Sequence, residues 1–417
     1  MNILIKSATI LDKTSSYHKQ TKDILIENGI ITKIDDSIEN SNGFEEFSSK
    51  DLHISQGWLD TSVSFGEPGF EERETISNGL KTAGESGFTD ILVNPNTNPA
   101  IDNATTVSFI KNKGFQHAVN IHPIGALTKN SEGDYLAELY DMQQAGAVAF
   151  GDFQSGIENP NMLKIALQYA QNFDGLVLSY PQENKIAGKG IVNEEENSTK
   201  LGLKGIPNLA EELQIARDLF ILEYTGGKLH IPTLSTAKSV ALIKAAKEKG
   251  LDITCSVSIL NLLLTDDAIT DFNTHFKVLP PLRTSTDRKG LLTGLQDGTI
   301  DFVTSNHMPI DVEFKTIEFD HAQYGSIGLE SIFGALNSVF DTEKVIEILT
   351  QYKTRFGIDS HTLNEGSLAN ITLFNPSETY QFSTNDISST SKNAALLGST
   401  LNGKALGVIN NNQMILK

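Results

Sequence analysis

Between residues 54 and about 305, the sequence alternates eight times between a short β-rich run and a stretch of helical length. The longer stretches are amphipathic, as at 73–86 and 207–224, and several end at a glycine suited to cap a helix, such as Gly114. The predicted strands are residues 57–65, 89–94, 118–124, 147–152, 174–180, 227–233, 252–258 and 300–305. Eight strand–helix units are the number that closes a (β/α)8 TIM barrel. A doubly wound open sheet is the alternative, but no glycine-rich dinucleotide loop supports it.

The two ends of the chain have a different pattern from this central region. β-rich runs occupy residues 3–5, 24–26, 30–34, 368–374, 405–409 and 414–416. Asn28-Gly29 is a hairpin signal between two of them. We expect residues 1–53 and 366–417 to form one small composite β-sandwich domain, and residues 54–365 to form the barrel. The Ser/Thr/Asn-rich segment 379–395 is predicted to be a surface excursion.

Composition excludes several classes of function. The formal net charge of −19 disfavours nucleic acid, whose binding needs a basic patch, and an anionic membrane surface. Cys255 is the single cysteine, so neither a disulfide framework nor a cysteine metal cluster can form. The first residues lack the apolar core of a signal peptide, and no run approaches the roughly 18 apolar residues of a membrane span. We therefore expect a cytoplasmic protein with no membrane or nucleic-acid partner.

The first barrel strand carries small polar side chains toward a loop. In GWLDTSVSFGEPG, residues 57–69, strict alternation places Asp60, Ser62 and Ser64 on one face, and Gly66 begins the loop. The C-terminal ends of barrel strands are where active sites lie. No Ser-His-Asp arrangement or nucleophile elbow accompanies the serines, so we favour serines that fill space in the core over a nucleophilic serine.

Several longer motifs resemble one family closely. They are EPGFEERETISNG (67–79), PNTNPAIDN (95–103), PIGALTK (123–129), AGKG (187–190), LGLKGIP (201–207), FKVLPPLRTSTDRKGLLTGLQDGTID (276–301), IGLE (327–330) and GSLANITLF (366–374). The sequence resembles the dihydroorotases related to the hydantoinases, cyclic amidohydrolases of pyrimidine biosynthesis in the amidohydrolase superfamily. The resemblance covers nearly the whole chain. It implies a barrel of the amidohydrolase type with a composite β-sandwich, a zinc cofactor, and hydrolysis of a cyclic amide C–N bond.

The resemblance also implies that most of the zinc ligands are missing. The six positions at which the family has His or Asp ligands are here Ser62, Ser64, Asp152, Tyr180, Thr233 and Asn306. Asp152 alone keeps a ligand side chain, and a serine hydroxyl is a weak zinc ligand beside imidazole or carboxylate. Asn306 replaces the Asp that also serves as general acid and base, and a carboxamide has no proton to exchange near neutral pH. We therefore expect no zinc and no other cofactor.

A check on the histidines does not depend on the resemblance. The nine histidines include no His-x-His pair and no two that lie three or four residues apart. His230 lies near Thr233 but at odd spacing, so regular alternation predicts that the two side chains point to opposite faces of their strand.

The substrate-binding positions implied by the resemblance are also depleted. The family's Arg, which anchors the substrate carboxylate, is Gly66 here, although its Asn partner is kept as Asn96. Another family Asn is Leu279, and a family His is Ile310. His307 is kept, and without its Asp neighbour we expect it to be structural.

Two functional hypotheses follow from this pattern. The first is a catalytically inactive dihydroorotase-like protein in which Asn306, Asp152 and His307 mark a vestigial site. Such a chain is expected to assemble with aspartate carbamoyltransferase or to form a homo-oligomer, as the resemblance implies. The second is an active dihydroorotase or related cyclic amidohydrolase with an altered or metal-free site that uses Asn96, Asp152 and His307.

Overall fold

The computed structural model describes residues 1–417, and its barrel strands follow the eight predicted runs. The barrel strands are β6 (Trp58–Val63), β7 (Phe88–Val93), β8 (Asn120–Gly125), β9 (Ala149–Phe150), β10 (Leu176–Leu178), β13 (Lys228–Leu234), β14 (Ile253–Ser258) and β15 (Phe302–Thr304). Neighbours in this order pair in parallel. The ring closes just beyond β15, where the Ser64 N–H donates to the carbonyl of His307 over 2.7 Å. The (β/α)8 prediction is therefore confirmed, and the open doubly wound sheet is wrong.

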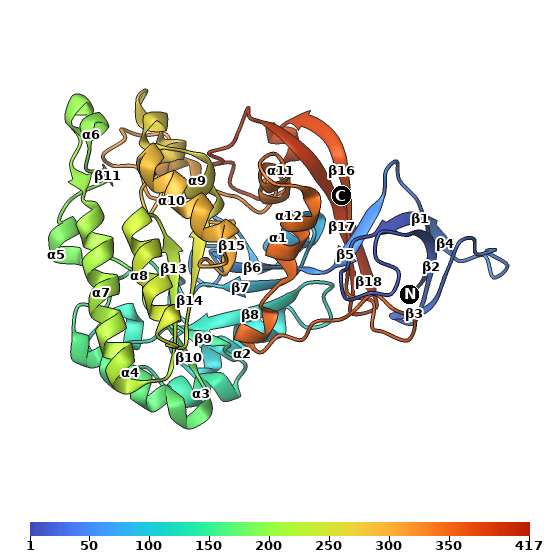
Figure 1. Cartoon of the computed structure of the whole chain (residues 1–417), viewed down its shortest axis with the longest axis horizontal. Helices are drawn as coiled ribbons and strands as arrows, with labels where there is room; N and C mark the ends of the chain where they lie inside the picture. Colours follow the sequence, from blue (N-terminus) through green and yellow to red (C-terminus); the bar gives the residue numbers. More distant parts are fainter.

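Helices surround the strands on the outside of the ring (Figure 1). The longer ones are α1 (Ile76–Glu85), α2 (Ala104–Lys113), α4 (Pro160–Ala170), α7 (Asn208–Thr225), α8 (Ala237–Glu248), α10 (Ser285–Gln296) and α12 (Thr342–Thr350). The shorter ones are α3 (Leu139–Gln144), α5 (Asn184–Ala187), α6 (Glu196–Leu201), α9 (Ile259–Leu263) and α11 (Ile332–Asn337). Side chains cap several of them; Asn103, for example, accepts from the first N–H groups of α2. The largest hydrophobic core contains residues of both strands and helices, and a smaller one includes Leu59, Leu92 and Phe302 of the barrel strands.

The two ends of the chain share one sheet beside the barrel (Figure 1). Its strands are β1 (Asn2–Ile10), β2 (Thr21–Glu27), β3 (Ile30–Asp35), β4 (Glu45–Phe47), β5 (His53–Gln56), β16 (Ile371–Gln381), β17 (Thr400–Asn410) and β18 (Gln413–Leu416). They run in the order β18-β17-β16-β5-β1-β2-β3, with β4 paired to β1. The antiparallel pair of β5 and β16 joins the N-terminal strands to the C-terminal ones. A separate isoleucine-rich core belongs to this sheet. The sheet and this core form the β domain.

The segment 379–395 does not form a surface excursion, so this prediction is wrong. It begins in β16, and several of its later residues are buried. The hydroxyl of Ser389 donates to Glu330 over 2.5 Å, and the N–H of Thr390 donates to Glu74 over 2.9 Å. Both carboxylates are buried. The polar composition that suggested a surface loop is explained by these partners, since a buried polar group is tolerated when it is hydrogen-bonded.

No helix of the chain combines the length and the apolar character needed to cross a membrane.

Candidate functional site

The first barrel strand has one extra residue near its C-terminal end. Between Asp60 and Val63, β6 makes three steps while β7 makes two, which is a β-bulge. Leu59 packs in the smaller core of the barrel strands, whereas Val63 packs in the larger core that the helices share. Thr61 and Ser62, on successive residues of the bulge, both line a cavity at the end of the strand. The regular alternation predicted for this strand is therefore interrupted.

This cavity lies where the sequence predicts a vestigial site. Its lining includes five of the six predicted ligand positions, namely Ser62, Asp152, Tyr180, Thr233 and Asn306. The space open to the centres of water molecules is about 20 Å³. About 10–15 Å³ is enough for one water molecule, whereas small-molecule sites occupy about 300–1,000 Å³. In this conformation, the cavity has room for one water molecule but not for a cyclic substrate.

A hydrogen-bonded network of uncharged groups fills the region around the cavity. The side-chain amide of Asn94, which follows β7, donates to the hydroxyls of Ser62 and Ser64 over 3.1 Å each. Ser62 Oγ donates to Asn306 Oδ1 over 3.3 Å. Asn306 Nδ2 donates to the carbonyl of Leu279 over 3.2 Å. Sequence reasoning missed Asn94, and its place directly after the second barrel strand was the available signal.

Thr128 binds both carboxyl oxygens of Asp152. Its Oδ1 accepts from the Thr128 N–H over 3.0 Å, and its Oδ2 accepts from the Thr128 hydroxyl over 2.6 Å. Burial raises the pKa of Asp152, and these hydrogen bonds oppose part of that rise. Thr128 is the second residue of the site that sequence reasoning missed. The carboxylate is thus bound to the protein itself through both oxygens.

His230 and Thr233 line the same cavity, so the prediction of opposite faces is wrong. Thr233 has φ of +49°, and this left-handed backbone breaks the alternation of β13. Ser256 connects the two residues, since its Oγ accepts from the Thr233 N–H over 3.0 Å and lies 3.3 Å from His230 Nε2. Burial, with a smaller effect from Arg355, lowers the pKa of His230 to about 3. The imidazole is therefore neutral, and Thr254 occupies its other nitrogen at 2.9 Å.

Tyr180 occupies one wall of the cavity. Its side chain is buried and packs with Ala187, Ile206 and Leu279 in a small apolar cluster. Burial raises the pKa of Tyr180 well above its ordinary value. A neutral phenol in apolar surroundings is a filler of space and a poor metal ligand.

His307 lies outside the cavity lining, although it directly follows Asn306. Its Nδ1 accepts from the N–H of Gly328 over 3.2 Å, while its Nε2 has no partner. The side chain is fully buried, and burial lowers its pKa. The ring has an edge-to-face contact with Phe65. These contacts keep His307 away from the space in which a substrate would react.

The predicted substrate-binding positions do not line the cavity either. A Cβ atom on Gly66 would lie 1.7 Å from the carbonyl oxygen of Phe70, so this backbone excludes an arginine at that position. Asn96 keeps a buried Oδ1 with no partner. Leu279 turns its side chain into the cluster around Tyr180. Ile310 is buried and is held through its N–H by Asn393 over 3.2 Å.

These residues do not fit a zinc ion. No group of three or more His, Cys, Asp or Glu side chains is placed to hold a metal. Protein zinc sites use those side chains, at about 2.0–2.3 Å. Ser62 and Asn306 are bonded to each other, and Asp152 is bonded to Thr128. Apart from the Asp152 carboxylate, these donor atoms are therefore of the wrong kind, and all three side chains are already paired within the protein.

Comparisons with known proteins agree with the fold. A family model described as "Dihydro-orotase-like" matches residues 53–239. A dihydroorotase of Trichlorobacter lovleyi is 35% identical over 97% of this chain and 97% of its own length. A dihydroorotase of Pelotomaculum thermopropionicum is 36% identical over 100% of this chain and 99% of its own length.

Solved structures show the same fold at lower identity. An L-hydantoinase (dihydropyrimidinase) from Arthrobacter aurescens superposes with a TM-score of 0.83 at 20% identity, over 100% of this chain and 96% of that one. A D-hydantoinase (dihydropyrimidinase) from a Thermus species superposes with a TM-score of 0.82 at 19% identity, over 100% of this chain and 95% of that one. The barrel and its additional β domain thus have the amidohydrolase fold. Within this class, the chain belongs to the dihydroorotase family.

Proposed function

We propose that this protein is a dihydroorotase-like protein of pyrimidine biosynthesis that does not hydrolyse a cyclic amide, and that it serves as a structural partner of aspartate carbamoyltransferase. The observation that carries the first half is the hydrogen bond between Ser62 and Asn306, two positions at which the family has metal ligands. The second half follows from the family, together with a barrel that is complete around the altered site.

The chemistry explains why this site is a poor catalyst. Ring hydrolysis needs an activated water and a group that carries a proton to the leaving nitrogen. Asn306 cannot carry the proton, because a carboxamide does not titrate near neutral pH. The hydroxyls of Ser62 and Ser64 are bound to Asn94. The cavity of about 20 Å³ leaves no room for a substrate ring unless the loops move.

An active cyclic amidohydrolase with an altered or metal-free site is the second candidate. The observation that favours it is Asp152, a cavity-lining carboxyl whose pKa burial raises toward the range useful for acid–base catalysis. The buried, unpartnered Oδ1 of Asn96 is a free acceptor that a substrate could use. His307 is the third retained residue, although it is buried behind the cavity.

Metal analysis together with a dihydroorotate ring-opening assay separates the two candidates. We expect purified full-length protein to contain far less than one zinc per chain and to show no turnover above that of Asp152→Asn. Zinc-dependent turnover would establish an active enzyme. Turnover without metal that is lost in Asp152→Asn would establish the metal-free alternative.

Complex formation tests the partnership. We expect this protein and the aspartate carbamoyltransferase of the same organism to elute together in size-exclusion chromatography at about micromolar concentrations, the range of a specific interaction. Separate elution of the two proteins under these conditions would refute the partnership and leave the question of catalysis to the assay above.

A further inference from the structure

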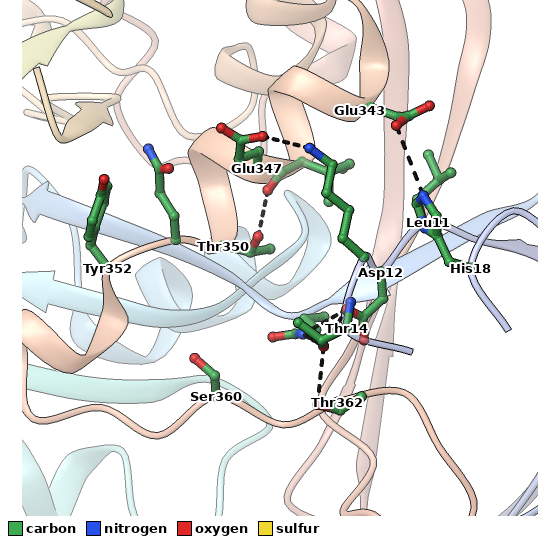
Figure 2. A pocket seen from close by; sticks show the side chains of 14 residues that line it. Leu11, Asp12, Thr14, His18, Glu343, Glu347, Thr350, Tyr352, Ser360 and Thr362 are labelled. Atoms are coloured by element: carbon green, nitrogen blue, oxygen red, sulfur yellow. Dashed lines mark hydrogen bonds and ion pairs between the residues drawn. The ribbon is translucent and has the colours of Figure 1, made fainter. Parts of the chain in front are cut away.

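A second and larger cavity lies between the β domain and the barrel (Figure 2). Its volume is about 290 Å³, which reaches the lower end of the range for small-molecule sites. Its walls come from the loop after β1, from α12, and from the segment 350–362. Gln56, just before β6, also lines it, so the cavity lies at the opposite end of that strand from the vestigial site. Ligand sites occur preferentially at such domain junctions.

The charged side chains around this junction cavity determine which ligands it excludes. Three carboxylates line it, those of Asp12, Glu343 and Glu347, against one lysine, Lys13. Lys13 Nζ donates to Glu347 over 2.7 Å, so the single positive charge is already paired. Glu343 pairs with Lys19, and Glu347 also pairs with Lys344 at 2.7 Å. The charges of the wall are thus paired within the protein, and no free cation is left to bind a phosphate or carboxylate group. The ligand of this cavity is therefore uncharged.

One carboxylate is part of the wall and is not free to bind a ligand. Asp12 Oδ1 accepts from the N–H and the hydroxyl of Thr14 over 2.9 and 2.7 Å and from Gln56 Nε2 over 2.9 Å. Asp12 Oδ2 accepts from the Leu363 N–H over 2.8 Å. These bonds fix the loop after β1 against the segment that returns to the β domain. The cavity is thus built by buried hydrogen bonds and is not a gap between loosely packed surfaces.

The Tyr352 and Ser360 side chains on the wall have no hydrogen-bond partner in the protein, although the Tyr352 ring has an edge contact with Phe302. Figure 2 shows the Tyr352 ring and the Ser360 hydroxyl beside the cavity, with no bond to any other residue drawn. The Tyr352 side chain is 49% exposed, so one part of a flat aromatic surface is open to a ligand. His18 keeps a buried Nδ1 without a partner. Glu343 lies 4.0 Å from the other nitrogen of that ring.

We propose that the junction cavity binds an uncharged molecule of the nucleoside class, a planar base joined to a hydroxyl-bearing sugar. The base stacks on the ring of Tyr352, because an aromatic face binds flat rings whatever hydrogen-bond donors and acceptors they carry. The sugar hydroxyls meet Ser360, His18 and the carboxylate of Glu343, which supply both donors and acceptors. The lack of a free cation on the wall favours the nucleoside over its phosphorylated forms, whose phosphate would find no partner of opposite charge. This site does not depend on whether the vestigial site is active.

Saturation-transfer NMR and calorimetry on the full-length protein test the proposal, with uridine and adenosine as probes and their 5′-monophosphates as charged counterparts. We expect at least one nucleoside to bind with a dissociation constant on the order of 1 mM or tighter, and its monophosphate at least tenfold more weakly. We expect Tyr352→Ala to weaken binding at least tenfold. Tyr135→Ala, which removes another exposed tyrosine remote from the cavity, should leave binding unchanged.

Ser360→Trp gives an independent test, because it fills the cavity from an exposed position and is expected to leave folding intact. We expect this variant to abolish binding while its thermal unfolding matches that of the parent protein. The proposal is overturned if neither nucleoside binds at about 10 mM, if the monophosphates bind as tightly as the nucleosides, or if Tyr352→Ala behaves like Tyr135→Ala. Binding of a monosaccharide such as ribose with equal affinity would also overturn it, since the base would then contribute nothing.

Discussion

Ser62 Oγ donates to Asn306 Oδ1 over 3.3 Å, and this bond joins the end of the first barrel strand to the end of the last. In the family to which the chain belongs, both positions are expected to hold metal ligands. Here the two side chains bind each other, and Asn94 binds the serine from the other side. The side chains of the site therefore satisfy one another's hydrogen bonds. The contribution of this network to the free energy of unfolding can be measured.

Asn94→Ala is expected to destabilise the fold. The substitution removes the donor to Ser62 and Ser64, which are both buried, and leaves two hydroxyls with one partner fewer. Such losses cost about 1–3 kcal/mol in the free energy of unfolding. Urea denaturation measures the change. Asn98→Ala, at an exposed position of the same loop, is the control, and equal effects of the two variants would contradict the network.

Restoring the two histidines is not expected to restore zinc. The double variant Ser62→His, Ser64→His still faces Tyr180, Thr233 and Asn306, none of which is a good ligand. The imidazole at position 62 exceeds the room in a cavity of about 20 Å³, and the one at position 64 replaces a buried serine, so we expect a loss of about 1–3 kcal/mol from overpacking. Elemental analysis and thermal unfolding check both points, with the exposed Ser48→His as the control. One tightly bound zinc per chain would show that the remaining donors are better placed than we infer.

A buried ion pair between β7 and the segment after α12 is expected to be essential for stability. Lys353 Nζ lies 2.9 Å from Asp90 Oδ2, and both side chains are 2% exposed. Burial alone would raise the pKa of Asp90, but the charge of Lys353 holds it well below its usual range. Lys353→Met leaves a buried carboxylate without its counter-ion and should cost about 3–5 kcal/mol.

The matched control for this pair is on the surface. Lys249 pairs with Glu223 at 3.0 Å, with side chains 58% and 48% exposed. Lys249→Met should change the free energy of unfolding by no more than about 1 kcal/mol, because solvent screens exposed pairs. If the two lysine variants unfold at the same urea concentration, the Asp90 pair does not carry the stability that we assign to it.

His230 is expected to make the protein less stable in mild acid. Burial lowers its pKa to about 3 from an ordinary 6.5, so between these values the unfolded chain binds a proton that the folded chain does not. The free energy of unfolding therefore falls as the pH drops from 6.5 toward 3, by up to about 1.4 kcal/mol per pH unit, and is unaffected above 6.5. His230→Gln should remove from this slope the contribution of about one bound proton, which is about 1.4 kcal/mol per pH unit. The exposed His321→Gln should keep the slope of the parent protein, and an unchanged slope in His230→Gln would contradict the prediction.

The barrel strands were predictable because the signal for each strand is local. A β-rich run bounded by turn residues identifies β7 or β14 without any knowledge of its neighbours. The loss of the family's ligand side chains was equally visible, since it depends on residue types alone. The sequence did not predict the directions of the His230 and Thr233 side chains or the burial of segment 379–395. The segment 379–395 looked like a surface loop because Ser389 and Thr390 are polar, and only the fold brings Glu330 and Glu74 to them.

The sequence by itself determined the family, the eight-stranded barrel, and the replacement of imidazole and carboxylate ligands by hydroxyl, phenol and amide groups. The tertiary structure decided which of these groups meet. The bulge in β6 brings Ser62 to the cavity, and the left-handed backbone at Thr233 lets Thr233 line the cavity together with His230. Both features interrupt a side-chain alternation that the sequence predicts to be regular. The physical reason is that pairing with neighbouring strands sets the backbone of each strand end, and those neighbours are remote in the chain.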